Sequence, residues 1–350
     1  MPRYIRITAL LISVLMLLSL VGCKQNSTET NNSEPVSSYE PSRPDTNNDS
    51  ENIPASPAGN DEEVPTESET SAGTGNVTPE AFKLSDVQPI VKDGHYQYNP
   101  YLLSKETIRC FDIGFLEFYK DFLTAYMNYQ TDCACPDVEY AKSIDMVISY
   151  ECPFYSGDDL EFSWSVNYDY DAQRLNWTYQ VDKDTLQERI RLVADAMQDF
   201  LDLVTPADDE ADKVQTLYHA FCPLMTYAYD RADSREKIDG CYALLEHTGI
   251  CVTFSYAFAQ ILAQTDVDAT IASGAASDGE PHVWNYACIN GLYYFFDTTF
   301  ELNFRNGNAF VYYGMNLEDR VNSGVPEDMI WLGRYQEYEF VVADNHLNVR

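Results

Sequence analysis

The amino-acid sequence predicts an α+β protein in which helices pack against antiparallel strands. Apolar residues recur at helical spacing between Glu106 and Gln130, whereas apolar and polar residues alternate between Phe162 and Val181. Further along, Asn290-Gly291 separates two runs of apolar and aromatic residues, which is the strongest short-range indication of a β-hairpin with a two-residue turn. Because 45% of the 350 residues are hydrophobic, the chain can bury a sizeable core.

Residues 1–22 have the pattern of an export signal. Arg3 and Arg6 precede an apolar run that is too short to span a membrane. The run ends in Leu20-Val21-Gly22-Cys23, which resembles the bacterial lipobox, where the cysteine is lipidated and becomes the new N-terminus. A plain secretory signal with an incidental cysteine is the alternative. We expect a signal peptide at 1–22, a lipid on Cys23 and an extracytoplasmic protein anchored to the bacterial cell membrane.

Residues 23–85 are predicted to be a disordered acidic tether. They are rich in Ser, Thr, Asn, Glu, Pro and Gly and carry 12 acidic and 3 basic residues. Such a stretch cannot bury enough apolar surface to offset its conformational entropy. From residue 86 on, 44 acidic and 17 basic residues give a formal charge of −27, out of −34 for the whole chain. This acidity excludes nucleic acid as a partner and favours cationic peptides and proteins.

Residues 86–204 are predicted to form an α+β region. The helical spacing between Glu106 and Gln130 predicts one helix, and the alternation from Phe162 to Val181 predicts a β-hairpin with one apolar face. Thr185-Leu-Gln-Glu188 is a capping-box pattern, which predicts that a second amphipathic helix begins there and continues to Leu201.

Residues 205–350 are predicted to form a second α+β domain. Pro206 and the acidic residues after it favour the first turn of a helix that begins near Thr205. Aromatic strands are expected at Phe310–Tyr313 and Tyr335–Val342.

A short motif in this second domain places a cysteine at the start of a helix. Gly249-Ile250-Cys251 is followed by apolar residues at positions 254, 257, 258, 261 and 262, the spacing of one helical face. The positive end of the helix dipole favours a thiolate, which is how a nucleophile is prepared. Taken alone, a cysteine on the first turn of an apolar helix is more often a small packed side chain than a nucleophile.

The hairpin around Asn290-Gly291 places a histidine beside a carboxylate. With this turn, Trp284 lies opposite Asp297, and His282 lies two residues from Trp284 on the same face of the strand. His282 and Asp297 are then diagonal neighbours, close enough for a hydrogen bond between their side chains.

Together, Cys251, His282 and Asp297 have the chemistry of a catalytic triad. A histidine held by a carboxylate can accept the proton of a thiol and stabilise the resulting thiolate as an ion pair. The alternatives are a structural histidine and an aspartate that merely caps a turn. The occurrence of all three residues in this order favours the catalytic interpretation.

The segment from about Asp212 to Glu301 resembles the transglutaminase-like core, a branch of the papain-like cysteine-protease fold. The resemblance rests on three motifs in order: Gly249-Ile250-Cys251 with Phe254-Ser255, then His282-Val283-Trp284-Asn285, then Asp297-Thr298-Thr299-Phe300. Upstream, Leu217-Tyr218-His219 and Tyr227-Ala228-Tyr229-Asp230 are similar to the helix and turn that precede the nucleophile in bacterial members. Val252-Thr253 and Thr298 depart from the family pattern at positions that border the substrate groove. The resemblance implies that residues 205–350 are a transglutaminase-like catalytic domain, in which the helix that bears the nucleophile packs on an antiparallel sheet.

The resemblance also implies an activity: attack of Cys251 on a peptide or protein amide, followed by hydrolysis or transamidation of the acyl-enzyme, without a cofactor. The backbone N–H of Cys251 is one natural donor to the oxyanion, and Gln215 and Tyr229 are candidates for the second. Trp284 and Asn285 are expected to support the site. The alternative function is a non-catalytic binding or scaffold module that keeps the fold.

The other cysteines point to no metal site. Cys133-Ala-Cys135 is too short for a zinc knuckle and has no matching second pair, and the acidic run at 208–210 lacks the glycine and ligand spacing of a calcium loop. Disulfide pairing cannot be deduced from the spacing.

Overall fold

The prediction of an α+β protein is confirmed by a computed structural model, which describes residues 81–228, 239–275, 279–304, 307–327, 330–332 and 340–349. Across these residues helices alternate with short strands, and most strand pairs are antiparallel. The expected signal peptide at 1–22, the lipidation site Cys23 and the expected tether up to residue 80 lie outside the described residues.

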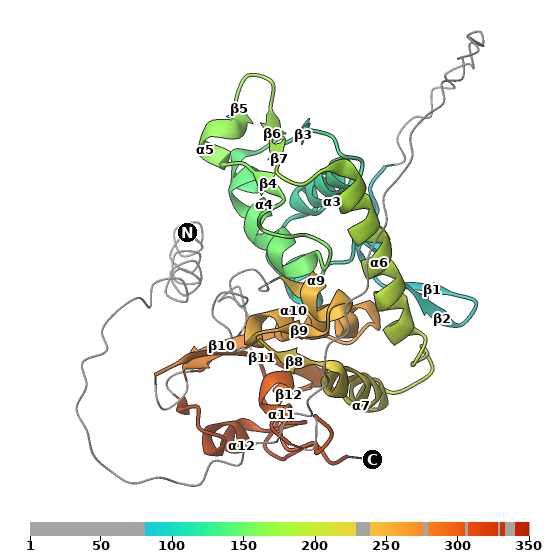
Figure 1. The fold of residues 1–350 in the computed structure, drawn as a ribbon, viewed down its shortest axis with the longest axis vertical. Coiled ribbons are helices and arrows are strands. Elements are labelled where there is room, and N and C mark those ends of the chain that lie inside the picture. Colours follow the sequence, from blue (N-terminus) through green and yellow to red (C-terminus); the bar gives the residue numbers. More distant parts are fainter. Residues whose placement is uncertain are drawn as a thin grey trace, which may run out of the picture. The chain divides into compact units, whose positions relative to one another are not determined.

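Helices dominate the first half of the described chain, with short strands between them (Figure 1). After a 3-10 helix at Leu84–Val87, the helices are α2 (Lys105–Cys110), α3 (Ile113–Met127), α4 (Val138–Glu151), α5 (Trp164–Asn167) and α6 (Lys183–Leu201). The strands are β1 (Ile90–Lys92), β2 (His95–Gln97), β3 (Asp132–Ala134), β4 (Leu160–Glu161), β5 (Tyr168–Asp169), β6 (Arg174–Asn176) and β7 (Thr178–Tyr179).

The single helix expected between Glu106 and Gln130 is in fact two helices, α2 and α3. The chain breaks before Ile113 because the side chain of Asp112 accepts a hydrogen bond from the N–H of Phe115 at 2.9 Å. This N-cap satisfies a backbone N–H that has no partner within the helix. The apolar stripe continues across the break, so the periodicity alone conceals it.

The prediction of a hairpin from Phe162 to Val181 is wrong for the first of its two strands. The helical turn α5 replaces the middle of that arm, and the side chain of Asn167 accepts a hydrogen bond from the N–H of Ser163 at 2.8 Å. Val166 is 81% exposed, so the alternation here does not mark a buried face. Two separate strand pairs lie across the expected turn, β5 with β6 and β4 with β7, and β6 also pairs with β3.

The helix expected from the capping box is present, but it starts earlier. Asp182, not Thr185, is the N-cap of α6, because its carboxylate accepts hydrogen bonds from the N–H and the hydroxyl of Thr185 at 3.0 and 2.7 Å. An aspartate at the first available position takes the capping role, and Thr185 becomes a residue of the first turn. The end of the helix at Leu201 is as predicted.

The second half of the described chain builds a helix on a sheet. Its helices are α7 (Glu210–Phe221), η2 (Cys222–Leu224), α9 (Gly240–Leu245), α10 (Cys251–Gln264), α11 (Thr298–Glu301) and α12 (Leu317–Asn322). Its strands are β8 (Thr226–Tyr227), β9 (Thr248–Gly249), β10 (Ala269–Ala275), β11 (Pro281–Ile289), β12 (Leu292–Phe296) and β13 (Ile330–Leu332).

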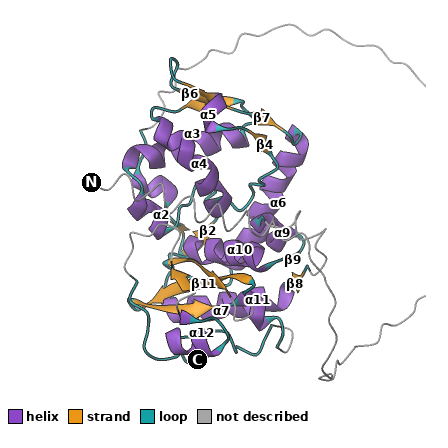
Figure 2. Ribbon diagram, turned by 90° about the vertical axis from the view of Figure 1, so that its left-hand side faces the viewer, coloured by secondary structure: helices purple, strands orange, loops and turns teal. Residues whose placement is uncertain are grey.

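The main sheet of the described residues has the order β12-β11-β10-β13, with every neighbouring pair antiparallel. Helix α10 packs on β10 and β11 and on its other side meets α4, α6 and α9 (Figure 2). This arrangement confirms the predicted packing of the helix that begins at Cys251 on an antiparallel sheet. Nearly every residue of α10 is buried, so the helix is part of the core.

Two expectations for this second half are corrected. Helix α7 begins at Glu210 because Asp209 caps it, while Thr205 donates hydrogen bonds to Asp208 in the preceding turn. Residues 310–313 form no strand; beside them, Phe295 and Met315 make a single isolated β-bridge. Of the strand expected at 335–342, residues 335–339 lie outside the described residues.

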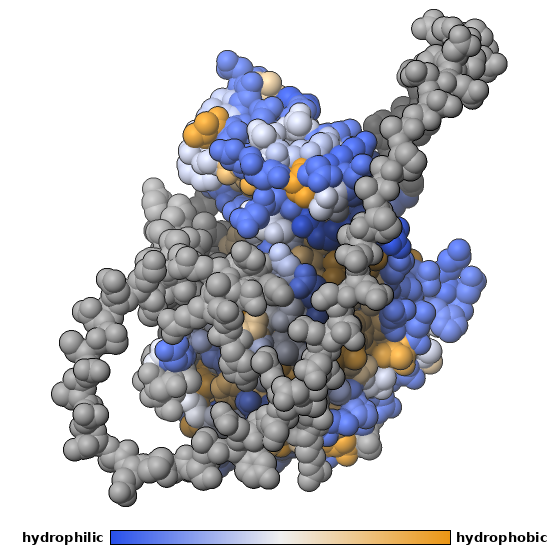
Figure 3. Space-filling model, viewed as in Figure 1, coloured by the Kyte–Doolittle hydropathy of each residue, from blue (hydrophilic) through white to orange (hydrophobic). Residues whose placement is uncertain are grey.

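The surface of the N-terminal helical part is mainly hydrophilic in the view of Figure 3. Among the described residues, no helix combines the length and the hydropathy needed to cross a membrane.

Candidate active site

Cys251 is the first residue of α10, as the sequence predicted. Immediately before it, the N–H of Ile250 donates a hydrogen bond to the hydroxyl of Thr253 at 3.2 Å. The carbonyl of Gly249 accepts one from Ala228 at 2.7 Å, which fixes the preceding strand β9 to β8. A Cβ atom on Gly249 would lie 2.6 Å from the Cβ of Thr253, so only glycine fits at this approach. The start of α10 is therefore held rigidly on both sides.

Buried polar side chains fix the rest of α10 to the N-terminal part of the chain. Gln264 accepts a hydrogen bond from the N–H of Asn99 at 3.0 Å and donates one to its carbonyl at 2.8 Å. One turn earlier, Gln260 donates a hydrogen bond to the carboxylate of Glu151 at 2.9 Å. These contacts give residues 86–204 a role in positioning the cysteine, which the sequence pattern had not indicated.

The hairpin register is the predicted one. Ile289 pairs with Leu292 across the Asn290-Gly291 turn, and both turn residues have positive φ, as a type I′ turn requires. At the far end of the same pair of strands, Nε2 of His282 lies 2.7 Å from Oδ2 of Asp297. The predicted diagonal contact is therefore confirmed.

His282 is buried between aromatic rings and linked to both other members of the predicted triad. Its ring stacks on Phe300 at a centroid distance of 4.3 Å and lies 5.7 Å from the ring of Trp284. Since Nε2 is engaged by Asp297, Nδ1 is the nitrogen left for Cys251. Burial lowers the pKa of His282, but the charge and hydrogen bond of Asp297, together with the nearby thiol of Cys251, raise it to about 9. The imidazole is thus charged at neutral pH.

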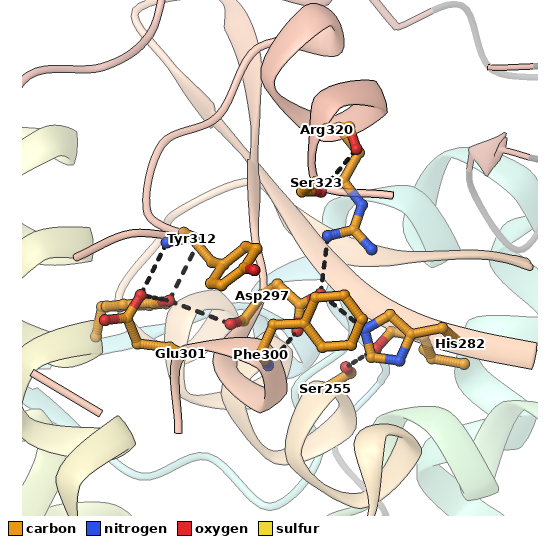
Figure 4. Close-up of polar contacts among 10 residues, drawn as sticks. Ser255, His282, Asp297, Phe300, Glu301, Tyr312, Arg320 and Ser323 are labelled. Carbon is orange, nitrogen blue, oxygen red and sulfur yellow. Dashed lines mark hydrogen bonds and ion pairs between the residues drawn. The ribbon is translucent and has the colours of Figure 1, made fainter. Parts of the chain in front are cut away.

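Asp297 is fully buried and carries a second cation that the sequence analysis missed. Nη1 of Arg320, from α12, lies 2.8 Å from Oδ2, the same oxygen that His282 contacts (Figure 4). The other carboxylate oxygen accepts a hydrogen bond from the N–H of Phe300 at 2.9 Å. Burial raises the pKa of Asp297, but the charges of His282 and Arg320 outweigh it and hold that pKa below its ordinary value.

The supporting residues divide between the two faces of β11. Trp284 is fully buried on the His282 face and packs against that imidazole. Asn285 points to the opposite face, where it donates a hydrogen bond to the carbonyl of Ser255 in α10 at 2.7 Å. Its support is therefore indirect, since it ties the helix that bears Cys251 to the strand that bears His282.

The contacts of Cys251, His282 and Asp297 identify neither of the two candidates as the second oxyanion donor. Gln215 lies half-buried on α7 and is not among the hydrogen-bond partners of His282 or Asp297. Tyr229 lies outside the described residues. The helix start itself supplies N–H groups without intrahelical partners beside Cys251.

The eight described cysteines are free thiols, and most of them have a pKa above the ordinary value of a thiol. Burial raises the pKa of Cys133, Cys135 and Cys241 to about 12, and it also raises that of the half-buried Cys288. Within the described residues no group of three or more His, Cys, Asp or Glu side chains is arranged to hold a metal ion.

Fold and site together define a class of protein: an α+β core in which a helix presents a buried thiol to a His–Asp pair on an antiparallel hairpin. No family model and no curated protein matches the sequence. Among solved structures, one described as a TGase is similar to 34% of this chain, with a TM-score of 0.29, 17% identity and 34% of its own length covered.

A second solved structure, described as a candidate cysteine protease from Cytophaga hutchinsonii, is similar to 42% of this chain. The TM-score is again 0.29 and the identity 17%, and 43% of that protein is covered. This chain therefore spans about a third of the first structure and less than half of the second.

Proposed function

We propose that this protein is a thiol-dependent amide acyl-transfer enzyme in which Cys251 is the nucleophile, His282 the base and Asp297 the orienting acid. The observation that carries the proposal is the position of His282, which hydrogen-bonds Asp297 through Nε2 at 2.7 Å and is close enough to Cys251, at the start of α10, for that thiol to raise the pKa of His282. A buried thiol, an imidazole and a carboxylate linked in this way form a proton-transfer chain.

The resting state is the ion pair in which charged His282 already holds, on Nδ1, the proton given up by the thiol of Cys251. The thiolate then attacks the amide carbonyl carbon, and a C–S bond forms. As the C–N bond breaks, the imidazolium returns its proton to the leaving amine, which leaves a thioester on Cys251. Water or a second amine next attacks the thioester and gives its proton to neutral His282, and the C–S bond breaks to regenerate the thiolate.

The oxyanion of each tetrahedral intermediate needs hydrogen-bond donors. The backbone N–H of Cys251 lies at the start of α10, where a helix offers no acceptor to its first N–H groups, so it suits this role. The dipole of the 14-residue helix α10 adds to the stabilisation of negative charge at this end. Substrate therefore approaches with its carbonyl oxygen directed at the helix start.

The location and the substrate charge are also part of the proposal. The export signal at 1–22 and the lipobox-like cysteine at position 23 support a protein anchored by a lipid on Cys23 to the outer face of a bacterial membrane. The charge of −27 on the chain from residue 86 on supports cationic rather than anionic peptides and proteins as substrates.

The experiment is an amide-turnover assay on the full chain and on Cys251→Ala. Unstructured glutamine-containing peptides of opposite net charge are incubated with each protein, and both ammonia and newly formed N-termini are measured, with and without an added primary amine. We expect turnover that falls at least about 1000-fold in Cys251→Ala. Equal background turnover in the two proteins would instead support a non-catalytic module. A dependence on the added amine distinguishes transamidation from hydrolysis.

A further inference from the structure

Arg320 occupies an unusual position for an arginine. It is fully buried, and its guanidinium carbon lies 4.1 Å from the centre of the Trp284 ring and 5.4 Å from that of Phe300. Within the described residues, Nη1 binds Asp297, while Nε and Nη2 have no hydrogen-bond partner. A buried arginine with only one of its donor nitrogens paired costs free energy, so packing alone does not explain it.

The surroundings of Arg320 are shared with His282. Trp284 and Phe300 each contact both side chains, and both cations meet the same oxygen of Asp297. In Figure 4 the guanidinium and the imidazole approach Asp297 from different sides. The two cations therefore share one anion inside a common aromatic enclosure.

Helix α12 carries Arg320 into this enclosure, and its own anchoring is extensive. Asn316 and Asp319 exchange hydrogen bonds at the start of the helix, at 3.1 and 2.8 Å. The side chain of Asn316 also donates to the carbonyl of Asp344 at 2.8 Å, and Nδ1 of His346 lies 2.9 Å from Asp319. The C-terminal segment thus holds α12, and through it Arg320, against the site.

We propose that Arg320 is a positioning residue for the triad: it holds the carboxylate of Asp297 in place and partly neutralises its charge, and so sets how strongly His282 retains its proton. This inference rests on the proposed function of Cys251, His282 and Asp297. Arg320 touches neither substrate nor the reacting sulfur in this scheme, and it acts only through Asp297.

The proposed reaction requires a group that limits how strongly His282 holds its proton. An imidazolium that holds its proton too strongly cannot release it to the leaving amine, and catalysis is most efficient when the pKa lies near the working pH. A single buried carboxylate beside an imidazole stabilises the imidazolium strongly, because the local dielectric constant is low. A second cation on the same oxygen weakens that stabilisation.

Other titratable groups also surround Asp297, and their charges affect how strongly His282 holds its proton. They come from every element packed around it, namely Tyr218 of α7, Cys222 of η2, Glu301 of α11, and Tyr312 in the loop that follows. Burial raises the pKa values of Tyr218, Cys222 and Tyr312, so these three are uncharged near neutral pH. Among the described residues, Arg320 is thus the cation that shares the carboxylate of Asp297 with His282.

The test compares the pH profile of Cys251 alkylation by iodoacetamide in the full chain and in Arg320→Gln. Gln keeps a donor near Oδ2 and removes the charge. We expect the alkaline limb, which reports loss of the imidazolium proton, to move up by roughly one pH unit. Arg320→Lys, which keeps the charge, should move it by much less. An unchanged alkaline limb in Arg320→Gln would overturn the inference, because a merely structural arginine changes the amount of folded protein and not the limb.

A second pair of variants covers the case in which Arg320→Gln does not fold. Asp297→Asn and the double variant Asp297→Asn/Arg320→Gln are compared; the double variant removes both charges of the buried pair and leaves neither uncompensated. Since Arg320 acts through Asp297, the two should show the same alkylation profile, and a further shift in the double variant would overturn the inference. Failure of the proposed function is distinguishable, because Cys251 of the unaltered chain would then react no faster than its other thiols.

Discussion

Nε2 of His282 and Nη1 of Arg320 lie 2.7 and 2.8 Å from one atom, Oδ2 of the fully buried Asp297. The two cations come from β11 and from α12, two elements that the hairpin register alone does not connect. Because both cations contact the same carboxylate, the negative charge of Asp297 holds both of them in the site.

Replacing Asp297 by Asn should abolish most of the activity and destabilise the fold. The amide carries no charge to hold the imidazolium, and its geometry favours the wrong tautomer of His282, so we expect turnover to fall by about 10³–10⁴-fold. Arg320 would be left as a buried, uncompensated cation, at a cost of about 3–5 kcal/mol in the free energy of unfolding. Urea titrations and peptide turnover measure the two effects. Asp266→Asn, which alters a largely exposed ion pair with Lys105, is the control and should change both by little.

The stability of the protein should fall between pH 6.5 and 9. The folded-state pKa of His282 is about 9, above its ordinary value of 6.5, so the imidazolium stabilises the folded state fully below pH 6.5. This contribution, about 3 kcal/mol, is lost as the pH rises through 9. In His282→Gln, the free energy of unfolding obtained from urea titrations should differ less between pH 6 and pH 9.5 than it does in the unaltered protein. Parallel pH curves for the two proteins would contradict the assigned charge state.

Gly249→Ala should disturb the start of α10. The new Cβ would lie 2.6 Å from the side chain of Thr253, and that side chain accepts the hydrogen bond of Ile250. We expect a loss of about 1–3 kcal/mol in the free energy of unfolding and slower alkylation of Cys251. Gly157→Ala is the matched control, because a Cβ there meets no atom within 4 Å. If both variants are equally stable and equally reactive, glycine is not needed before the nucleophile.

Asn285→Leu should loosen the packing of α10 on β11 without altering Cys251, His282 or Asp297. It removes the donor to the carbonyl of Ser255 and leaves that buried acceptor unpaired, at a cost of about 1–3 kcal/mol. Because this bond ties α10 to β11, the rate of Cys251 alkylation should fall by more than the loss of folded protein accounts for. Differential scanning calorimetry and alkylation on the same sample check both. A stable variant with unaltered reactivity would show that Asn285 only fills space.

The sequence predicts the local parts of this site well. The register of β11 and β12 follows from one dipeptide, Asn290-Gly291, because a two-residue turn leaves a single way to pair the strands. The same reasoning predicts the contact of His282 with Asp297, since a diagonal pair follows from register alone. The start of α10 at Cys251 likewise follows from apolar spacing.

Features that depend on docking of distant segments are not predictable in this way. Arg320 lies 23 residues after Asp297 in the chain, and nothing in its neighbourhood distinguishes it from a surface arginine. The break at Asp112 and the early start of α6 at Asp182 were missed for a different reason. Each depends on which of several polar side chains takes the cap, a competition that periodicity does not register.

The measurement that tests the central claim most directly is the rate of Cys251 alkylation by iodoacetamide at pH 5.5, in the full chain and in His282→Ala. Cys251 is 7% exposed, so the small reagent is required, and the half-buried Cys110 and Cys288 serve as internal references. Mass spectrometry of digested samples gives the rate at each thiol. We predict that Cys251 reacts at least about tenfold faster than the references and that His282→Ala removes this preference. Reaction of Cys251 no faster than that of Cys110 and Cys288 would contradict an activated nucleophile.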